Sequence, residues 1–166
     1  RRLLEAPPGP VYYGDFTYPT EAPEAHFSAR ARYEGYAQAM AEAGRSPLFM
    51  GTGQRIDRME RLPYLNRWLA GQKSPFGVLC VASSTALPLC HAAAQAGRQI
   101  GRDIAIATFG DAPVTLNGLA LDTCVVPMHE MGQQAVELLL GKIKNPRRRA
   151  AVVLPLDYVP GASIPS

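Results

Sequence analysis

The stretch from residue 76 to residue 131 constrains the fold most, because apolar runs in it alternate with helical sequence. The runs at residues 77–81, 104–109 and 123–126 are apolar, and alanine-rich helical sequence separates the first two. Apolar runs of four to eight residues bounded by turn residues are typical of strands buried on both faces. Strands that alternate with helices form βαβ units. We therefore predict an α/β fold with an open, parallel sheet.

Candidate site residues stand where two of these strands end. Ser83 and Ser84 follow the first run, and Phe109, Gly110 and Asp111 end the second. In open parallel sheets, ligands bind in the crevice outside the carboxyl ends of the strands. We therefore predict a small-molecule site at these five residues. A structural role is an alternative for each side chain. The serines can cap the next helix, Phe109 can close the core, and Asp111 can cap a loop.

The remaining apolar segments extend the same alternation. Further strands are predicted at residues 11–16, 47–50 and 150–156. Further helices are predicted at residues 30–43, 57–71 and 128–144. Ser28 stands before the first of these helices in the position of an N-cap. Pro63 lies inside the second, so we expect that helix to begin late or to bend.

Length and charge fit one globular domain. The chain has 166 residues, of which 47% are hydrophobic and 19% charged, so it can bury a sizeable core. The formal net charge is +3, and part of the basic excess comes from Arg1, Arg2 and residues 147–149. Such short basic runs are more often solvated ends and loops than nucleic-acid contacts. We therefore expect no direct DNA binding by this chain.

The cysteines indicate a reducing compartment. Cys80, Cys90 and Cys124 form an odd set without metal-ligand spacing, and two of them lie in apolar runs. The sequence has no apolar run near 18 residues and no signal peptide, so we expect a cytoplasmic protein outside the membrane. We expect neither a metal nor a cofactor.

The sequence does not favour an enzyme. The three histidines, His26, His91 and His129, have no acidic or serine companion at a spacing typical of a catalytic group. The glycines at residues 51–53 lack the Lys-Ser/Thr of a phosphate-binding loop. A small flavodoxin-like or phosphatase domain remains an alternative. Turnover that depends on Asp111 or Arg32 would support it.

Five motifs resemble motifs of the lactose-repressor family of transcription regulators. They follow one another along the chain in the same order as in that family. The segment SARARYEGY at residues 28–36 is similar to that family's "S-x-R-x-x-G-(aromatic)" helix. The other four lie at residues 81–84 (family V-x-A-N-D), 103–111 (the strand ending in an aromatic and acidic residues), 127–132 (the start of a late helix) and 152–159 (the closing strand). The resemblance covers almost the whole chain.

The resemblance implies a periplasmic-binding-protein-like sandwich, of which this chain holds mostly the carboxyl-terminal lobe. Residues 1–127 would form that lobe, residues 128–150 a helix that crosses into the amino-terminal lobe, and residues 151–166 the closing strand and tail. The family binds a small sugar or sugar phosphate between two lobes, and forms homodimers. It contacts operator DNA through an amino-terminal helix-turn-helix that this chain lacks.

The family's effector-binding arginine matches Arg32, whose planar guanidinium can fork onto anionic or hydroxyl acceptors. A surface arginine is the alternative. Ser28 can contact the effector as well as cap its helix. Departures from the family are Ser83-Ser84 in place of Asn-Asp, and Gly110 in place of the first Asp. With the ATFGD sequence these resemble the fructose-repressor branch, which would imply a phosphorylated or less hydroxyl-rich effector.

The helix after Ser84 resembles the family's dimer-forming helix. Its residues Leu87, Pro88, His91 and Ala94 fall on one face, which we predict to form the dimer interface; a plain core face is the alternative. A periplasmic-type sugar-binding protein for transport shares the implied fold and is the main alternative function. A helix-turn-helix encoded upstream would favour the regulator, and a signal peptide would favour transport.

Overall fold

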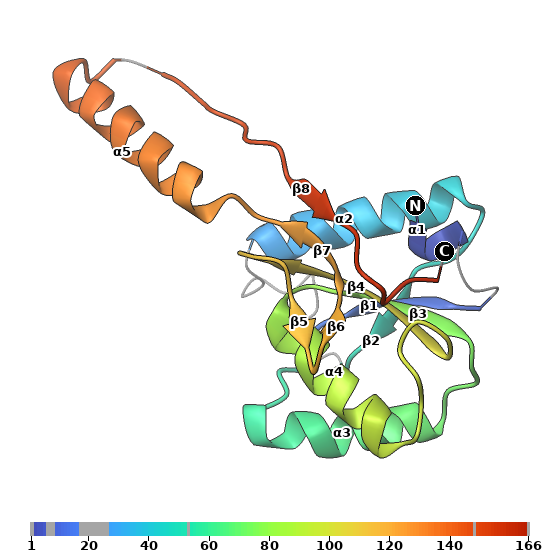
Figure 1. Ribbon diagram of the computed structural model, residues 1–166. Coiled ribbons are helices and arrows are strands. Elements are labelled where there is room, and N and C mark those ends of the chain that lie inside the picture. The colour runs from blue at the N-terminus through green and yellow to red at the C-terminus, as the bar shows by residue number, and fades with distance from the viewer. Residues whose placement is uncertain (1, 6–8, 17–26, 53, 148, 166) are drawn as a thin grey trace.

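The computed structural model describes residues 2–5, 9–16, 27–52, 54–147 and 149–165. It consists of an α/β body from which a long arm projects (Figure 1). The helices are α1 (Arg2–Glu5), α2 (Phe27–Glu42), α3 (Arg61–Ala70), α4 (Ser83–Gln95) and α5 (Met128–Lys144), with a short 3-10 helix, η1 (Arg58–Glu60). The strands are β1 (Val11–Gly14), β2 (Leu48–Met50), β3 (Phe76–Cys80), β4 (Ile104–Gly110), β5 (Thr115–Leu116), β6 (Leu119–Ala120), β7 (Asp122–Val125) and β8 (Asp157–Val159).

Within the described residues, six strands form one sheet in the order β2-β1-β3-β4-β7-β8. The pairs from β2 to β7 are parallel, and β8 joins β7 antiparallel. In the centre of the sheet, Val78 of β3 pairs with Tyr12 of β1 and with Ile106 of β4. The predicted α/β fold with a mostly parallel sheet is confirmed, and it has the open form rather than a barrel.

Helices cover both faces of the sheet and bury two different kinds of residue. Large side chains of α3 and α4, among them Leu65 and Leu89, pack on one face against Ile106. On the other face, α1 and α2 meet Tyr13 and the small residue Ala107. Because successive strand residues point to opposite faces, the sequence of β4 puts isoleucines toward α3 and α4 and alanines toward α1 and α2. The second face therefore has more room.

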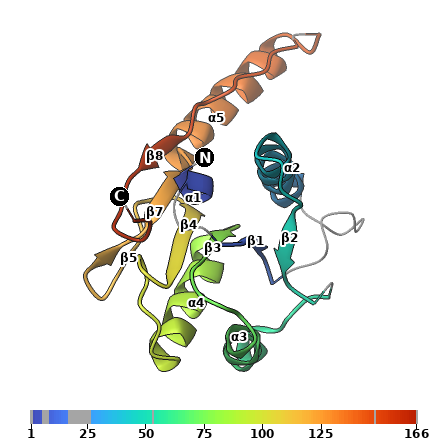
Figure 2. The ribbon, with the colours of Figure 1, turned by 90° about the vertical axis from the view of Figure 1, so that its right-hand side faces the viewer.

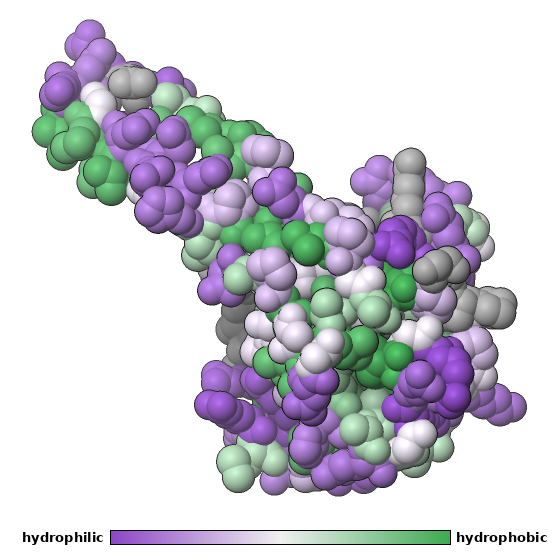
Figure 3. Space-filling model, in the orientation of Figure 1, coloured by the Kyte–Doolittle hydropathy of each residue, from purple (hydrophilic) through white to green (hydrophobic). Residues whose placement is uncertain are grey.

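The arm consists of α5 and the chain that returns from it. All of α5 lies among the described residues, and none of its residues is buried. Most of its apolar side chains are exposed instead of packed, as the green atoms along the arm in Figure 3 show. Leu140 is 53% exposed, Ile143 67% and, on the returning chain, Val153 93%. An uncovered apolar surface of this kind is typical of an interface.

The structure corrects two predictions about the second half of the chain. The strand predicted at residues 150–156 is wrong, because this segment runs along the arm, away from the sheet. Only the next three residues, β8, reach β7 and pair with it. The loop predicted after Asp111 contains a hairpin, β5–β6, whose turn holds Asn117 and Gly118 at φ of 50° and 82°. These two residue types adopt such angles most readily.

Other boundaries differ by small amounts. The second predicted helix begins late, since η1 precedes α3 and Pro63 stands in the first turn of α3. Ser28 is the second residue of α2, so its predicted N-cap position is wrong. Arg1, Arg148 and His26 lie outside the described residues.

In the part of the chain that is described, no helix is both long and apolar enough to cross a membrane.

The tail after β8 passes very close to the strands it crosses. A Cβ placed on Gly161 would lie 2.4 Å from the carbonyl oxygen of Ala120. We predict that Gly161→Ala lowers the free energy of unfolding by about 2 kcal/mol, because backbone cannot move aside cheaply. The matched control is Gly35→Ala in the middle of α2, where a Cβ meets nothing within 4 Å. It should raise stability by about 0.5–1 kcal/mol. Urea unfolding measures both, and equal effects would contradict this packing.

Candidate functional site

The parallel strands bring their carboxyl ends to one edge of the sheet, and Arg32 reaches this edge from α2. Its Nη1 donates a hydrogen bond of 3.0 Å to the carbonyl oxygen of Val81, just after β3. Its Cζ lies 4.7 Å from the centre of the Phe109 ring, near the end of β4. Two predicted site residues, Arg32 and Phe109, are therefore in contact. The ring and the carbonyl hold the guanidinium in one orientation.

Tyrosine hydroxyls fix the helix that carries Arg32. The hydroxyl of Tyr13 donates to the carbonyl oxygen of Ala29, at 3.0 Å, and that of Tyr36 donates to the carbonyl oxygen of Val11, at 2.8 Å. The Tyr36 oxygen also accepts the N–H of Leu48, at 2.9 Å. Burial raises the pKa of Tyr36, which keeps its hydroxyl protonated as a donor. These bonds attach α2 to β1 and β2, and so set where Arg32 can reach.

The predicted serines begin α4. Ser83 and Ser84 are its first two residues, and its N-cap is Ala82, so neither serine occupies the N-cap. Ser83 is half-buried and Ser84 exposed. Only Ala82 separates them from Val81, whose carbonyl holds Arg32. The start of α4 therefore lies beside the arginine, with backbone N–H groups and two hydroxyls as possible donors.

The residues after Phe109 differ in what they can contribute. Gly110 ends β4, and a Cβ there would lie 2.9 Å from the carbonyl oxygen of Ala112. The local backbone thus leaves little room for a side chain at this position. Asp111 follows it and is exposed. Ser28, one turn before Arg32 on α2, is half-buried.

Asp15 is a candidate that sequence reasoning missed. It follows β1 directly and is only 2% exposed. By strand alternation it lies on the same face as Tyr13, toward α2. Burial raises the pKa of the Tyr13 hydroxyl, the charge of Asp15 raises it further, and that of Arg32 lowers it. A carboxylate and a guanidinium thus lie near the same phenol. The signal available in the sequence was an acidic residue immediately after an apolar, aromatic run.

A groove of about 680 Å³ extends from this site along the sheet. It lies between α1 and α2, which cover the same face of the sheet (Figure 2). Arg32 and Phe109 line it, and much of the remainder is apolar, including Leu3, Leu79 and Ala107. The predicted residues Ser28, Ser83, Ser84, Gly110 and Asp111 lie outside its lining. The apolar part offers few of the hydrogen-bond partners that a sugar needs.

The predicted interface residues lie on the outer side of α4. Leu87 and Pro88 are half-buried, whereas His91 and Ala94 are exposed. His91 Nε2 lies 3.3 Å from the side-chain nitrogen of Gln95, whose oxygen accepts a bond of 3.0 Å from Asn66 of α3. This stripe is therefore available on the surface of the body, next to α3.

The thiols and acidic residues do not form an evident metal site. In the ranges that the structure describes, no three His, Cys, Asp or Glu side chains are grouped so that they could hold an ion. Burial raises the pKa of Cys90 to about 11 and that of Cys80 well above its ordinary value. Both thiols are therefore protonated at neutral pH, and act as small apolar groups in the core.

Comparisons with known proteins agree with this fold. A family model described as "periplasmic binding protein-like domain" matches residues 12–164. The ribose operon repressor of Bacillus subtilis (strain 168) is 33% identical over 87 residues, which are 50% of this chain and 26% of that protein. The motif resemblance to lactose-repressor-family regulators is thereby supported. Nothing in these comparisons supports the fructose-repressor branch.

Solved structures give the same fold at lower identity. A LacI-family transcriptional regulator from Enterococcus faecium with bound ribose has a TM-score of 0.69 and 20% identity, over 94% of this chain and 56% of that one. The lac repressor dimer bound to operator and the anti-inducer ONPF has a TM-score of 0.79 and 19% identity, over 99% and 55%. The chain thus spans about a quarter of the ribose operon repressor, and a little over half of these structures.

Proposed function

The chain belongs to the periplasmic binding protein-like domain family, and from this premise we propose that it is the effector-sensing part of a lactose-repressor-family transcription regulator. The observation that carries the proposal is Arg32, which Phe109 and Val81 hold at the carboxyl edge of the sheet. Operator DNA would be bound by a helix-turn-helix outside this chain, in the cytoplasm. The repressor relatives support this role over catalysis.

We propose a small sugar or sugar phosphate as the effector. The Arg32 guanidinium has five N–H donors, so it can hold Val81 and still donate to hydroxyl or phosphate oxygens. Phe109 offers an aromatic face, and Ser28, Ser83 and Ser84 offer hydroxyls. The family has an aspartate where this chain has Gly110. Asp15 and Asp111 would replace that carboxylate and accept hydrogen bonds from sugar hydroxyls. The solved neighbour with bound ribose supports a small sugar as the effector.

We further propose that residues 1–127 form one of two lobes, and that residues 128–150 cross into the other. The uncovered apolar face of α5 supports this, since such a face is typically buried against protein. An effector between the lobes would stabilise the closed arrangement over the open one. That difference in affinity would shift the population of the DNA-binding dimer, which is the requirement for allostery. Of residues 151–166, the part from β8 onwards would close the lobe, because residues 151–156 return along the arm.

Thermal unfolding with sugars tests the effector site. Ribose, lactose and their phosphates are titrated against the complete protein. At a hundred times its Kd, a bound sugar should stabilise the native state by about 2.7 kcal/mol. Arg32→Ala should abolish the shift, and Arg32→Lys should reduce it, because an ammonium cannot fork.

Arg30→Ala is the matched control, since it removes the same charge from an exposed position of α2. It should leave the sugar-induced shift unchanged. A shift that persists in Arg32→Ala would reject the site assignment. Absence of a shift with every sugar would reject the effector class.

The lobe assignment predicts that substitutions in α5 act only in the complete protein. In this chain alone, Leu140→Ser and Ile143→Ser should change the free energy of unfolding by less than about 0.5 kcal/mol, because both side chains are already exposed. In the complete protein each should cost about 2 kcal/mol. Lys142→Ser, on the same helix, should be neutral in both. Equal effects in the two proteins would contradict the crossing helix.

We propose that the stripe of Leu87, Pro88, His91 and Ala94 on α4 forms the dimer interface. Ala94→Glu should weaken dimerisation about tenfold or more, because it places a charge in the contact. Ala41→Glu, at an exposed position of α2, is the control. Sedimentation equilibrium gives the dimer Kd of each. A dimer unaffected by Ala94→Glu, or equally weakened by the control, would place the interface elsewhere.

A further inference from the structure

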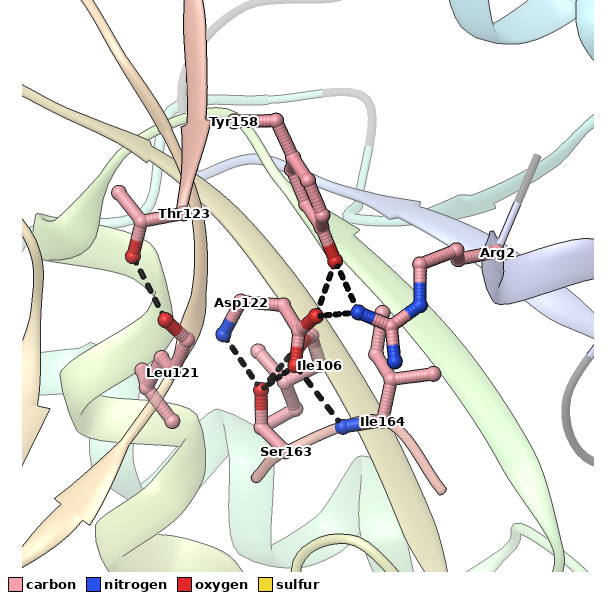
Figure 4. A network of polar contacts seen from close by, with 8 residues as sticks. All are labelled: Arg2, Ile106, Leu121, Asp122, Thr123, Tyr158, Ser163 and Ile164. Carbon is pink, nitrogen blue, oxygen red and sulfur yellow. Dashed lines mark hydrogen bonds and ion pairs between the residues drawn. The ribbon is translucent and has the colours of Figure 1, made fainter. Parts of the chain in front are cut away.

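A buried carboxylate lies where the arm joins the body. Asp122, the first residue of β7, is fully buried, and its two oxygens have different partners (Figure 4). Oδ1 accepts hydrogen bonds from Nη1 of Arg2, at 3.0 Å, and from the hydroxyl of Tyr158. Oδ2 accepts the N–H of Ile164, at 3.1 Å. One carboxylate therefore joins three parts of the chain that are far apart in sequence, namely α1, β7 and the segment from β8 to Ile164.

The Oδ2 side holds the tail to the body. The Ser163 oxygen accepts the N–H of Asp122 at 2.8 Å, and its hydroxyl donates to the carbonyl oxygen of Ile106 at 2.6 Å. The N–H of Ile106 in turn donates to the carbonyl oxygen of Ser163, at 3.0 Å. These bonds attach the tail to β4 and β7. They belong to the body of the protein, not to the arm.

The Oδ1 side connects the two roots of the arm. The chain leaves the body through β7 and returns through β8, where Tyr158 is the middle residue (Figure 1). Arg2, from α1, braces both, because its Nη1 also donates to the Tyr158 oxygen, at 2.8 Å. The three polar groups form a closed triangle, in which each is bonded to the other two.

The charges and protonation states suit a clamp that is stable but can open. Burial raises the pKa of Tyr158, and its hydrogen bond to Asp122 raises it further, so the hydroxyl remains a donor. The Asp122 side chain is 0% exposed, whereas that of Arg2 is 40% exposed. A buried carboxylate needs its partners, while a half-exposed guanidinium can exchange them for water. Arg2 can therefore exchange its contact with Oδ1 for water, while the bonds to Ile164 and Ser163 keep the tail attached to the body.

We propose that the Arg2–Asp122–Tyr158 triangle is a hinge clamp that sets the position of the arm relative to the sheet, and thereby tunes effector affinity. The clamp rests on the proposed two-lobe function. The clamp favours one arrangement of the lobes, and effector binding depends on the population of the competent one. The clamp acts through this population. Arg2 and Tyr158 also line the groove that extends from the Arg32 site, so amide exchange without ligand is the readout that separates the clamp from a direct contact with the sugar.

The variants remove the two Oδ1 partners and leave Asp122 in place, because its Oδ2 also holds the tail. They are Tyr158→Phe, Arg2→Gln and the double variant, in the complete protein. The matched control is Tyr12→Phe, which removes a hydroxyl bonded to Gln72 at 2.7 Å, away from the arm. Two quantities are measured: amide hydrogen exchange without ligand, and the Kd for ribose.

Loss of the clamp should speed amide exchange about tenfold or more at Val126, at Met128 and in β8, and leave β3 and β4 unchanged. The ribose Kd should change about three- to thirtyfold. The double variant should differ little from the larger single effect, since both partners act on Oδ1. Tyr12→Phe should move neither quantity.

The clamp would be overturned by unchanged exchange at the arm's roots, by an unchanged ribose Kd in the clamp variants, or by an equal response to Tyr12→Phe. If the wild-type protein does not bind ribose at all, the result counts against ribose as the effector and not against the clamp. Hydrogen exchange then decides the clamp by itself, since it needs no ligand. The two proposals can therefore fail separately.

Discussion

Parallel pairing of β1, β3 and β4 is the constraint on which the rest of the structure depends. These strands are covered by helices on both faces, so they are apolar along most of their length. Parallel order also brings their carboxyl ends to one edge, and places Val81 and Phe109 where one arginine touches both. Burial of the strands and assembly of the site are thus consequences of the same arrangement.

The two faces of the sheet differ in their side chains and in their function. Leucines and isoleucines fill much of the α3–α4 face, which is closely buried core. The α1–α2 face combines small strand residues with tyrosines whose hydroxyls attach α2, and Arg32 and the groove lie there. The arm leaves the sheet at the strands that lie beyond β4, which are β7 and β8. There a buried carboxylate, Asp122, performs the joining that apolar packing performs elsewhere.

The alternation of strands and helices could be predicted from periodicity. Arg32 and Phe109 could be named as candidates, the first from the motif resemblance and the second from the end of a predicted strand, but their contact with each other is seen only in the structure. The position of residues 150–156 could not, since an apolar run is the same in sequence whether it pairs in a sheet or lies along an exposed helix. The hairpin at residues 115–120 is too short for periodicity, although Asn117-Gly118 was a usable turn signal. Arg2 looked like a solvated chain end. Its partner lies 120 residues away, so only the tertiary structure reveals it.

The most direct test of this account is a crystal structure of the complete protein with ribose bound. The account predicts sugar density between two lobes at the carboxyl edge of the sheet, within hydrogen-bond distance of the Arg32 guanidinium and against the Phe109 ring. It also predicts that α5 is covered by the second lobe. Sugar bound elsewhere, with Arg32 making no contact to it, would contradict the central claim.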